Sequence, residues 1–234
     1  MLGKGPIFIF AYHIEKQNKF LNLRLEIIYS NKKEIIIMSK FTFSTYQNSE
    51  RLKLYYNSII CQDLLLKNNY TSIFEIPTLE KIVINTTSSA YATDRKNLIP
   101  ALLALELITG QKAKFTCAKK SLASFKIREN QILGCKVTLR RKHLYNFLIV
   151  FTSVVLPKLR DFSGISKKSL NTSGNLSLGF TNLLVFPHLE NHFEFFQNVQ
   201  GMNINFSSNR TSRSVNRVLY SAFQIPEVKE KLNI

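Results

Sequence analysis

Short segments in which apolar and polar residues alternate with a period of two predict β-strands in this chain. The clearest is 134–140, where Cys135, Val137 and Leu139 alternate with polar neighbours. Such alternation is typical of a strand in an antiparallel sheet that has one covered face and one exposed face. Further strands are expected at 81–86, at 183–186 and at 202–206.

Apolar residues at helical spacing predict helices between these strands. One helix runs from about Leu52 to an end at Asn68 and Asn69. Another begins after Asn97, a residue type that caps helix N-termini, and ends at Gly110, which suits the left-handed position after a helix. The other helices are expected at 144–155 and 215–222.

This irregular order of strands and helices predicts an α+β fold: an antiparallel sheet with helices packed on one face and its other face open to a ligand. Residues 1–48 are expected to form an N-terminal extension with a possible β-hairpin and a linker, 49–226 the main domain and 227–234 a tail. The Gly-, Ser- and Asn-rich run from Ser163 to Gly179 is expected to be a long functional loop.

The charge balance narrows the choice of partner. The chain has 32 Lys and Arg residues against 15 Asp and Glu, a formal net charge of +17, which is typical of nucleic-acid-binding proteins. Residues 112–142 keep strand-like alternation while holding ten Lys or Arg and one acid, Glu129. Membrane surfaces and acidic proteins would also attract such a chain, and a solvated face would explain any single lysine. A folded surface for polyphosphate best explains the whole set.

Candidate chemical sites are few. Cys61, Cys117 and Cys135 are widely spaced, so reduced thiols are expected rather than a disulfide framework or a zinc ribbon. His188 and His192 stand four apart without a further ligand, so no metal or other cofactor is expected. No catalytic triad, phosphate-cradling loop or membrane-spanning stretch is recognisable in the sequence, so neither an enzyme nor a membrane span is expected. A free RNA chaperone or regulator and a basic nuclease are the alternatives.

Two kinds of RNA contact are expected from the basic region and the strands beside it. Basic side chains would neutralise phosphates, and the candidates are Lys112, Lys114, Lys119, Lys120, Lys126, Arg128, Lys136 and Arg140. Small polar side chains would bind 2′-hydroxyl groups or base edges, and the candidates are Asn85, Thr87, Ser121 and Thr138. Phe125 would either stack on a nucleotide or be buried.

Four collinear segments carry a resemblance to a known family. They are ITGQKAKFTCAKKSLASFKIRENQILGCKVTLRRKHLYNFL, LPKLRDFSGIS, SGNLSLGFTNLLVFP and QGMNINF. In this order and spacing they closely resemble large-subunit ribosomal protein five, the family that docks 5S ribosomal RNA onto the large ribosomal subunit. The resemblance runs from about Leu52 to Pro226.

The resemblance implies a non-enzymatic RNA-binding protein of the central protuberance, in contact with 5S ribosomal RNA, adjacent large-subunit ribosomal RNA and neighbouring proteins. In the family, the loop matching 118–128 reaches toward the P-site transfer RNA, which implies contacts from Lys119, Lys120, Ser124, Phe125, Lys126 and Arg128. The loop matching 163–178 helps to bridge to a protein of the small-subunit head, which implies contacts from Ser163, Lys167, Lys168, Asn171 and Asn175.

The chain departs from the family pattern at several positions. Thr87-Ser88-Ser89 replaces a glycine-containing turn, Ser124 replaces a glycine, and Ser163 replaces an arginine. The expected bridge loop, SLNTSGN, lacks the acid and the arginine that are often present.

The amino-acid composition gives evidence about the cellular compartment in which the protein acts. The chain is rich in Asn, Ile, Lys and Phe and has no Trp, as an AT-rich genome would yield. Together with the N-terminal extension, this composition resembles mitochondrion-encoded members of the family. A mitochondrial ribosome is therefore the expected location, with a plastid or the bacterial cytoplasm as the alternatives.

Overall fold

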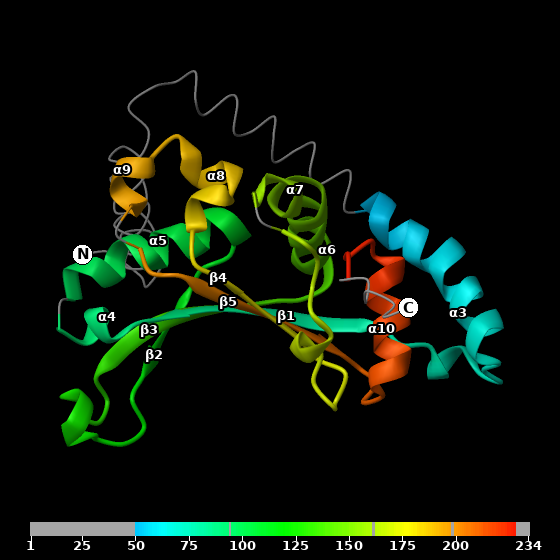
Figure 1. Ribbon diagram of the computed structural model, residues 1–234, viewed down its shortest axis with the longest axis horizontal. Coiled ribbons are helices and arrows are strands. Elements are labelled where there is room, and N and C mark those ends of the chain that lie inside the picture. The colour runs from blue at the N-terminus through cyan, green and yellow to red at the C-terminus, as the bar shows by residue number, and fades with distance from the viewer. Residues whose placement is uncertain (1–49, 94, 161, 198, 228–234) are drawn as a thin grey trace, which may run out of the picture. The chain divides into compact units, whose positions relative to one another are not determined.

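A five-stranded antiparallel sheet organises the protein. The computed structural model describes residues 50–93, 95–160, 162–197 and 199–227; the hairpin and linker expected within 1–48 lie outside this range. Within it the strand order is β2-β3-β1-β5-β4 (Figure 1). The strands are β1 (Leu79–Thr87), β2 (Lys114–Cys117), β3 (Ile132–Leu139), β4 (Leu176–Phe180) and β5 (Met202–Ser208).

Helices connect the strands and cover one face of the sheet. The first is helical from residue 50, passes through a π-helical turn at Tyr56–Ile60 and continues as α3. It ends at Asn69, whose φ of 49° is the left-handed conformation that Asn tolerates. The α-helices are α3 (Cys61–Asn68), α4 (Ser89–Thr93), α5 (Leu98–Thr109), α6 (Arg141–Val150), α7 (Leu156–Lys158), α8 (Pro187–Glu190), α9 (Phe193–Phe196) and α10 (Arg213–Ala222).

Between α6 and α7 the chain forms a second π-helical turn, Phe151–Val155. Short 3₁₀ turns complete the connections, at Ile73–Glu75, Arg95–Asn97, Ala123–Phe125, Lys167–Ser169 and Leu183–Val185. No helix among the residues that the structure describes is long and apolar enough to cross a membrane.

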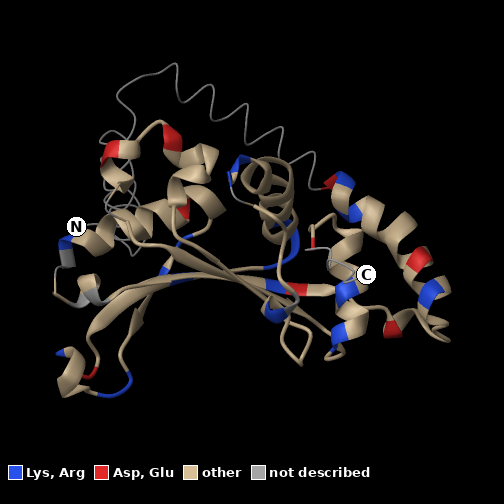
Figure 2. Ribbon diagram, in the orientation of Figure 1, with Lys and Arg blue, Asp and Glu red and all other residues tan. Residues whose placement is uncertain are grey.

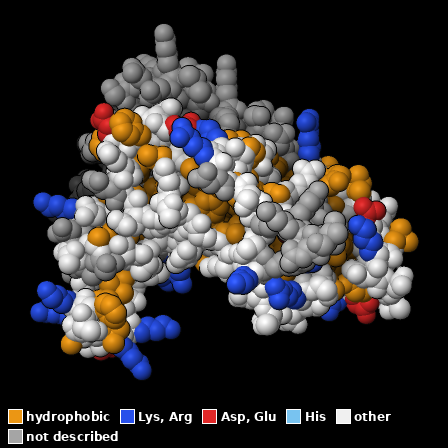
Figure 3. Space-filling view, viewed as in Figure 1, with side chains coloured by type: hydrophobic (Ala, Val, Ile, Leu, Met, Phe, Trp, Pro, Cys, Tyr) orange, Lys and Arg blue, Asp and Glu red, His pale blue; other side chains and the backbone are white. Residues whose placement is uncertain are grey.

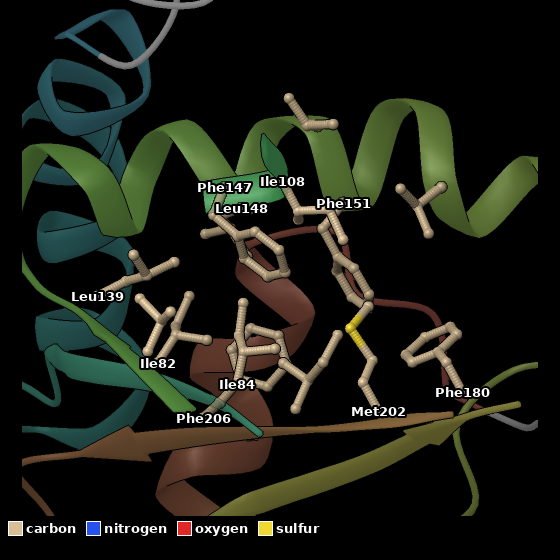
Figure 4. Packing of buried hydrophobic residues seen from close by; sticks show 14 of the residues in the cluster. Ile82, Ile84, Ile108, Leu139, Phe147, Leu148, Phe151, Phe180, Met202 and Phe206 are labelled. Atoms are coloured by element: carbon tan, nitrogen blue, oxygen red, sulfur yellow. The ribbon is translucent and has the colours of Figure 1, made fainter. Parts of the chain in front are cut away.

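The core lies between the sheet and the helices on its covered face. Ile82 and Ile84 of β1 are fully buried, as are Leu139 of β3 and Phe206 of β5. Figure 4 shows Phe151, from the turn that continues α6, among the sheet residues, and its ring lies 5.7 Å from that of Phe206. Burial of this continuous apolar layer fixes which face of each strand is covered, because a slip of one residue would reverse every side chain. The α+β class with one open sheet face is thereby confirmed.

Most of the predicted elements are confirmed, but two predictions for the region after α7 were wrong. The segment predicted as a strand at 183–186 is a 3₁₀ turn, Leu183–Val185, started by the Asn182 side chain, whose Oδ1 accepts from the Leu184 N–H at 2.9 Å. The loop predicted over 163–179 ends early, because β4 occupies 176–180 and pairs with β5. A short apolar run such as 183–186 does not distinguish a strand from a buried turn, and the Gly-, Ser- and Asn-rich composition of 163–179 indicated a loop although its last residues pair with β5.

Two smaller differences affect the predicted sheet and helix ends. The strand predicted at 134–140 is β3, which starts at Ile132 and ends at Leu139, so that Arg140 occupies the N-cap position of α6. Asn97 is the N-cap residue of α5 as predicted, but its side chain makes no capping hydrogen bond. Gly110 ends that helix with a φ of 65°, as predicted.

Candidate nucleic-acid interface

A row of side chains crosses all the strands on the open face of the sheet. Asn85 of β1 pairs with Lys136 of β3 on one side and with Asn203 of β5 on the other. Lys136 in turn pairs with Lys114 of β2, and Asn203 with Gly179 of β4. Directly paired residues of antiparallel strands share a face. Since neighbouring strands lie about 4.8 Å apart, the row spans roughly 19 Å.

A second row runs beside the first. Val83 of β1 pairs with Thr138 of β3 and with Asn205 of β5, and Asn205 pairs with Ser177 of β4. None of these side chains is buried. Apart from Val83 the two rows therefore present amides, hydroxyls and ammonium groups, the donors that RNA phosphates, 2′-hydroxyls and base edges accept from.

The positive charges on this face lie next to each other. Lys114 and Lys136 are directly opposite across the β2–β3 pair, and both are exposed. Like charges in this position destabilise a sheet, and no acidic residue lies within the two rows. An anion bound above the pair would relieve the repulsion.

Arg140 is placed differently from these lysines. It follows β3, and its Nη1 donates to Glu80 Oε1 at 3.1 Å in an exposed ion pair. An exposed pair of this kind is weak, so the guanidinium could exchange the carboxylate for a phosphate. Lys112 precedes β2 and is exposed, and Thr87 is exposed at the end of β1.

The loop between β2 and β3, residues 118–131, projects from the sheet with its charges on the outside. Lys119, Lys120 and Lys126 are exposed, as are Ser121, Ser124 and Arg128. Figure 2 marks basic positions along this loop, and Figure 3 shows basic side chains on its surface. Phe125 is 68% exposed, so of its two expected placements the structure shows the one outside the core. The loop therefore offers an apolar ring beside ammonium groups.

Backbone hydrogen bonds hold this loop in one conformation. Leu122 and Ile127 exchange N–H···O bonds of 2.9 and 3.1 Å, which closes its tip. At its base the Ala118 N–H donates to the Gln131 carbonyl at 2.8 Å, and the Asn130 N–H to the Ala118 carbonyl at 3.1 Å. A loop fixed in this way loses little conformational entropy when a ligand binds.

The part of the expected bridge loop that precedes β4, residues 163–175, is tied to α10. Gly174, whose φ is 74°, presents its carbonyl to the Asn216 side-chain N–H at 3.1 Å and to the Tyr220 hydroxyl at 3.1 Å. Burial raises the pKa of Tyr220 to about 12, so its hydroxyl stays a donor at physiological pH. The loop residues Ser163, Lys168 and Asn171 are exposed and Asn175 is half-buried; Lys167 lies in the turn at 167–169.

In the part of the chain that the structure describes, the cysteines and histidines do not gather into a metal site. Cys61, Cys117 and Cys135 are free thiols, and burial, followed by the nearby Glu106, raises the pKa of Cys135 to about 12. His188 lies in α8 and His192 at the start of α9, so they do not share one helix face. Within the described part of the chain no three His, Cys, Asp or Glu side chains gather as metal ligands would.

The structure adds residues that were not predicted for this interface. Asn203 and Asn205 of β5, together with Ser177 of β4, complete both rows on the open face. The signal was present in β5, where Asn203 and Asn205 alternate with the buried Met202, Ile204 and Phe206. β5 was predicted from its apolar residues alone, and the polar residues between them were not assigned to the open face.

Comparison with known proteins agrees with this architecture. The family model described as "Ribosomal protein L5" matches residues 72–128, and the model for the C-terminus of the same ribosomal family matches residues 132–226. The large ribosomal subunit protein uL5m of Prototheca wickerhamii is 41% identical over 226 residues, which cover 90% of this chain and 97% of that protein. The uL5m of Reclinomonas americana is 43% identical over 75% of this chain and 97% of that protein.

A bacterial relative is similar over the same length. The large ribosomal subunit protein uL5 of Pediococcus pentosaceus is 39% identical over 76% of this chain and 98% of that protein. Together these matches confirm the family that the sequence motifs indicated, and the two uL5m relatives support the mitochondrial location. The chain therefore belongs to the ribosomal protein L5 family, the non-enzymatic structural proteins of the large ribosomal subunit, as a mitochondrial member.

Proposed function

We propose that the open sheet face binds 5S ribosomal RNA and adjacent large-subunit ribosomal RNA in the central protuberance of the mitochondrial ribosome. The observation that carries this proposal is the exposed Lys114–Lys136 pair, in which two like charges lie directly opposite each other. The neighbouring Asn85, Asn203 and Thr138 supply uncharged donors to the same surface. Phosphate contacts would hold the RNA in place, and the amide and hydroxyl groups would bind hydroxyls and base edges.

The two loops extend this function. The basic loop at 118–131 would contact the P-site transfer RNA through its ammonium groups and Phe125, and the loop at 163–175 would contact a protein of the small-subunit head. Both assignments rest on the family resemblance, on the exposure of the side chains and on the hydrogen bonds that hold the loops. Residues 49–226 would form the RNA-binding domain, with 1–48 as an N-terminal extension and 227–234 as a C-terminal tail.

RNA binding by the purified chain tests the sheet-face assignment. The double variant K114E/K136E should bind 5S ribosomal RNA more weakly and with a smaller dependence on salt. Each lost phosphate contact should lower the slope of log K against log salt by about 0.7 to 0.9. The matched control is K53E/K67E, which reverses two exposed lysines on the helix that ends at Asn68. Equal losses in the two variants would mean that only net charge matters and would overturn the sheet-face assignment.

Co-sedimentation with ribosomal subunits distinguishes the proposed ribosomal protein from a free RNA chaperone or a nuclease. The protein should co-sediment with mitochondrial large subunits and be released only by high salt. A chaperone or nuclease would remain in the soluble fraction.

A further inference from the structure

An apolar patch lies on the helix side of the protein, away from the open sheet face. Phe193 and Phe195 of α9 are 51% and 67% exposed. Phe196 of the same helix and Leu189 of α8 are buried in the core. These two anchors fix both short helices, so the exposed rings are held at the surface rather than left on a loose loop. Figure 1 shows α8 and α9 on the same side of the sheet as α5.

The segment that carries these rings is acidic, in contrast to the basic chain as a whole. Residues 169–209 contain no Lys or Arg at all, although the whole chain has a net charge of +17. The acids in this stretch are Glu190 and Glu194, which come before and between the two phenylalanines. Figure 2 shows these acidic positions on α8 and α9, and Figure 3 shows apolar and acidic atoms together there.

The two carboxylates are not equivalent. Glu190 forms an ion pair with Lys158 of α7. Glu194 is exposed and has no ion-pair partner among the residues that the structure describes. Its carboxylate is therefore available to a partner, on the same short helix as two exposed aromatic rings.

We propose that Glu190, Phe193, Glu194 and Phe195, the α8–α9 patch, dock a segment of a neighbouring ribosomal protein that carries Lys or Arg beside apolar side chains. Exposed aromatic residues are typical anchors of protein interfaces. Glu194, which has no ion-pair partner among the described residues, would pair with a basic group of the segment and set its register. RNA suits the patch less well than a basic segment, because the Glu194 carboxylate repels phosphates.

The patch and the open sheet face would be occupied at the same time. Leu189 and Phe196 pack into the core on the covered side of the sheet, whereas Asn85 and Lys136 lie on the opposite side. One face would therefore hold RNA and the other a protein. The protein would link ribosomal RNA to the protein shell of the central protuberance, an inference that rests on the proposed RNA-binding function.

Photo-crosslinking in assembled particles tests this inference. The photoreactive residue p-benzoylphenylalanine replaces Phe195 in the full chain, and the chain is allowed to assemble into mitochondrial large subunits. After irradiation, mass spectrometry identifies the attached peptide. We expect a single neighbouring protein, attached at a segment with Lys or Arg and apolar residues. Attachment to ribosomal RNA, attachment to another part of this chain, or no product at all would each overturn the proposal.

The same photoreactive group at Phe74, which is 91% exposed and lies in a distant part of the sequence, is the matched control. It should not attach to the segment found from Phe195. If both positions capture the same peptide equally, the reaction reports only the abundance of that protein, and the α8–α9 patch is not its docking site.

Two variants test the contribution of the rings and of the charge. F193S/F195S and, separately, E194K should reduce retention of the cross-linked protein on salt-washed particles about tenfold, as removal of anchor residues does. Both variants should leave the thermal unfolding temperature and the affinity of the purified chain for 5S ribosomal RNA unchanged, because the altered side chains are exposed and remote from the sheet face. Full retention of the cross-linked protein by these variants would overturn the inference. Loss of RNA affinity in K114E/K136E is a separate result, which concerns only the open sheet face.

Discussion

Asn85 of β1 lies directly opposite Lys136 of β3, so that a neutral amide and an ammonium group share one cross-strand site on the open face. The same Asn85 faces Asn203 of β5. Asn is depleted in strands, whereas Val is enriched. An amide at this central position therefore fits the proposed RNA contact better than a contribution to folding.

This relationship predicts that Asn85→Val weakens RNA binding without harming the fold. Loss of a hydrogen bond to RNA should lower the affinity for 5S ribosomal RNA by roughly 2- to 13-fold, the effect of about 0.5 to 1.5 kcal/mol. Thermal unfolding should be unchanged or slightly higher. Filter binding and differential scanning fluorimetry on the same preparation check both parts. An unaltered affinity would remove Asn85 from the interface.

Gly134, which lies next to the cross-strand row of Asn85 and Lys136, should tolerate substitution less well than Gly110 at the end of α5. A Cβ at Gly134 would lie 2.2 Å from the Thr86 carbonyl oxygen and 2.8 Å from Thr87 Oγ1. Gly134→Ala must therefore shift β1 against β3, and overpacking of this kind costs about 1 to 3 kcal/mol. Because β1 and β3 carry Asn85 and Lys136, the same shift should weaken RNA binding.

Gly110→Ala is the matched control for that change. Its φ of 65° strains an alanine, but no atom lies within 4 Å of the added Cβ. The cost should be about 1 to 2 kcal/mol, without an effect on RNA affinity. Urea denaturation gives both free energies of unfolding. If Gly134→Ala and Gly110→Ala were equally stable and bound RNA equally well, the close contact between β1 and β3 at Gly134 would not be needed for RNA binding.

The fold was largely predictable because its signals are local. Alternation in β3 and β5, helical spacing and the Gly110 stop depend on neighbours in sequence, and these elements were predicted. The rows on the open face were not, because Asn85, Lys136 and Asn203 meet only through strand register. Strand order and register both come from pairing between segments far apart in sequence, which no short segment contains.

The projecting loop at 118–131 should act after folding and RNA docking. Reversal of Lys119, Lys120 and Lys126 to Glu changes only exposed side chains, and the backbone bonds between Leu122 and Ile127 remain. The triple variant should keep its unfolding temperature but lower P-site transfer RNA occupancy, which toeprinting or filter binding on isolated ribosomes measures. Normal occupancy would place the transfer RNA contact elsewhere.

The stability of the protein should depend on pH through His188. Burial lowers the pKa of His188 from 6.5, so the unfolded chain takes up a proton at a higher pH than the folded one. Stability should therefore fall as the pH drops through about 6.5, by at most about 1.4 kcal/mol per pH unit for this group. His188→Gln should reduce the slope of the free energy of unfolding between about pH 7.5 and 5.5, a window that brackets the unfolded pKa. An identical slope in the variant would assign the acid sensitivity to other groups.

Asn216 should control the loop expected to form the intersubunit bridge. Its buried side-chain N–H groups donate to the Gly174 carbonyl at 3.1 Å and to the Arg210 carbonyl at 2.7 Å. Asn216→Ala leaves both carbonyls without this donor, at a cost of about 1 to 3 kcal/mol. Tyr220 still bonds Gly174, so the loop at 171–175 should loosen rather than detach. Hydrogen exchange should be faster there, and association of the ribosomal subunits should be weaker.

Asn209→Ala separates this local effect from general destabilisation. Asn209 also bonds the backbone twice: its Oδ1 accepts from the Thr78 N–H at 2.8 Å, and its Nδ2 donates to the Ile76 carbonyl at 3.5 Å. These bonds join the end of β5 to the chain before β1 and do not involve the loop at 171–175. Both variants should lose stability, but only Asn216→Ala should accelerate exchange in that loop and weaken subunit association. Equal effects on association would mean that global stability, and not the position of Gly174, limits the bridge.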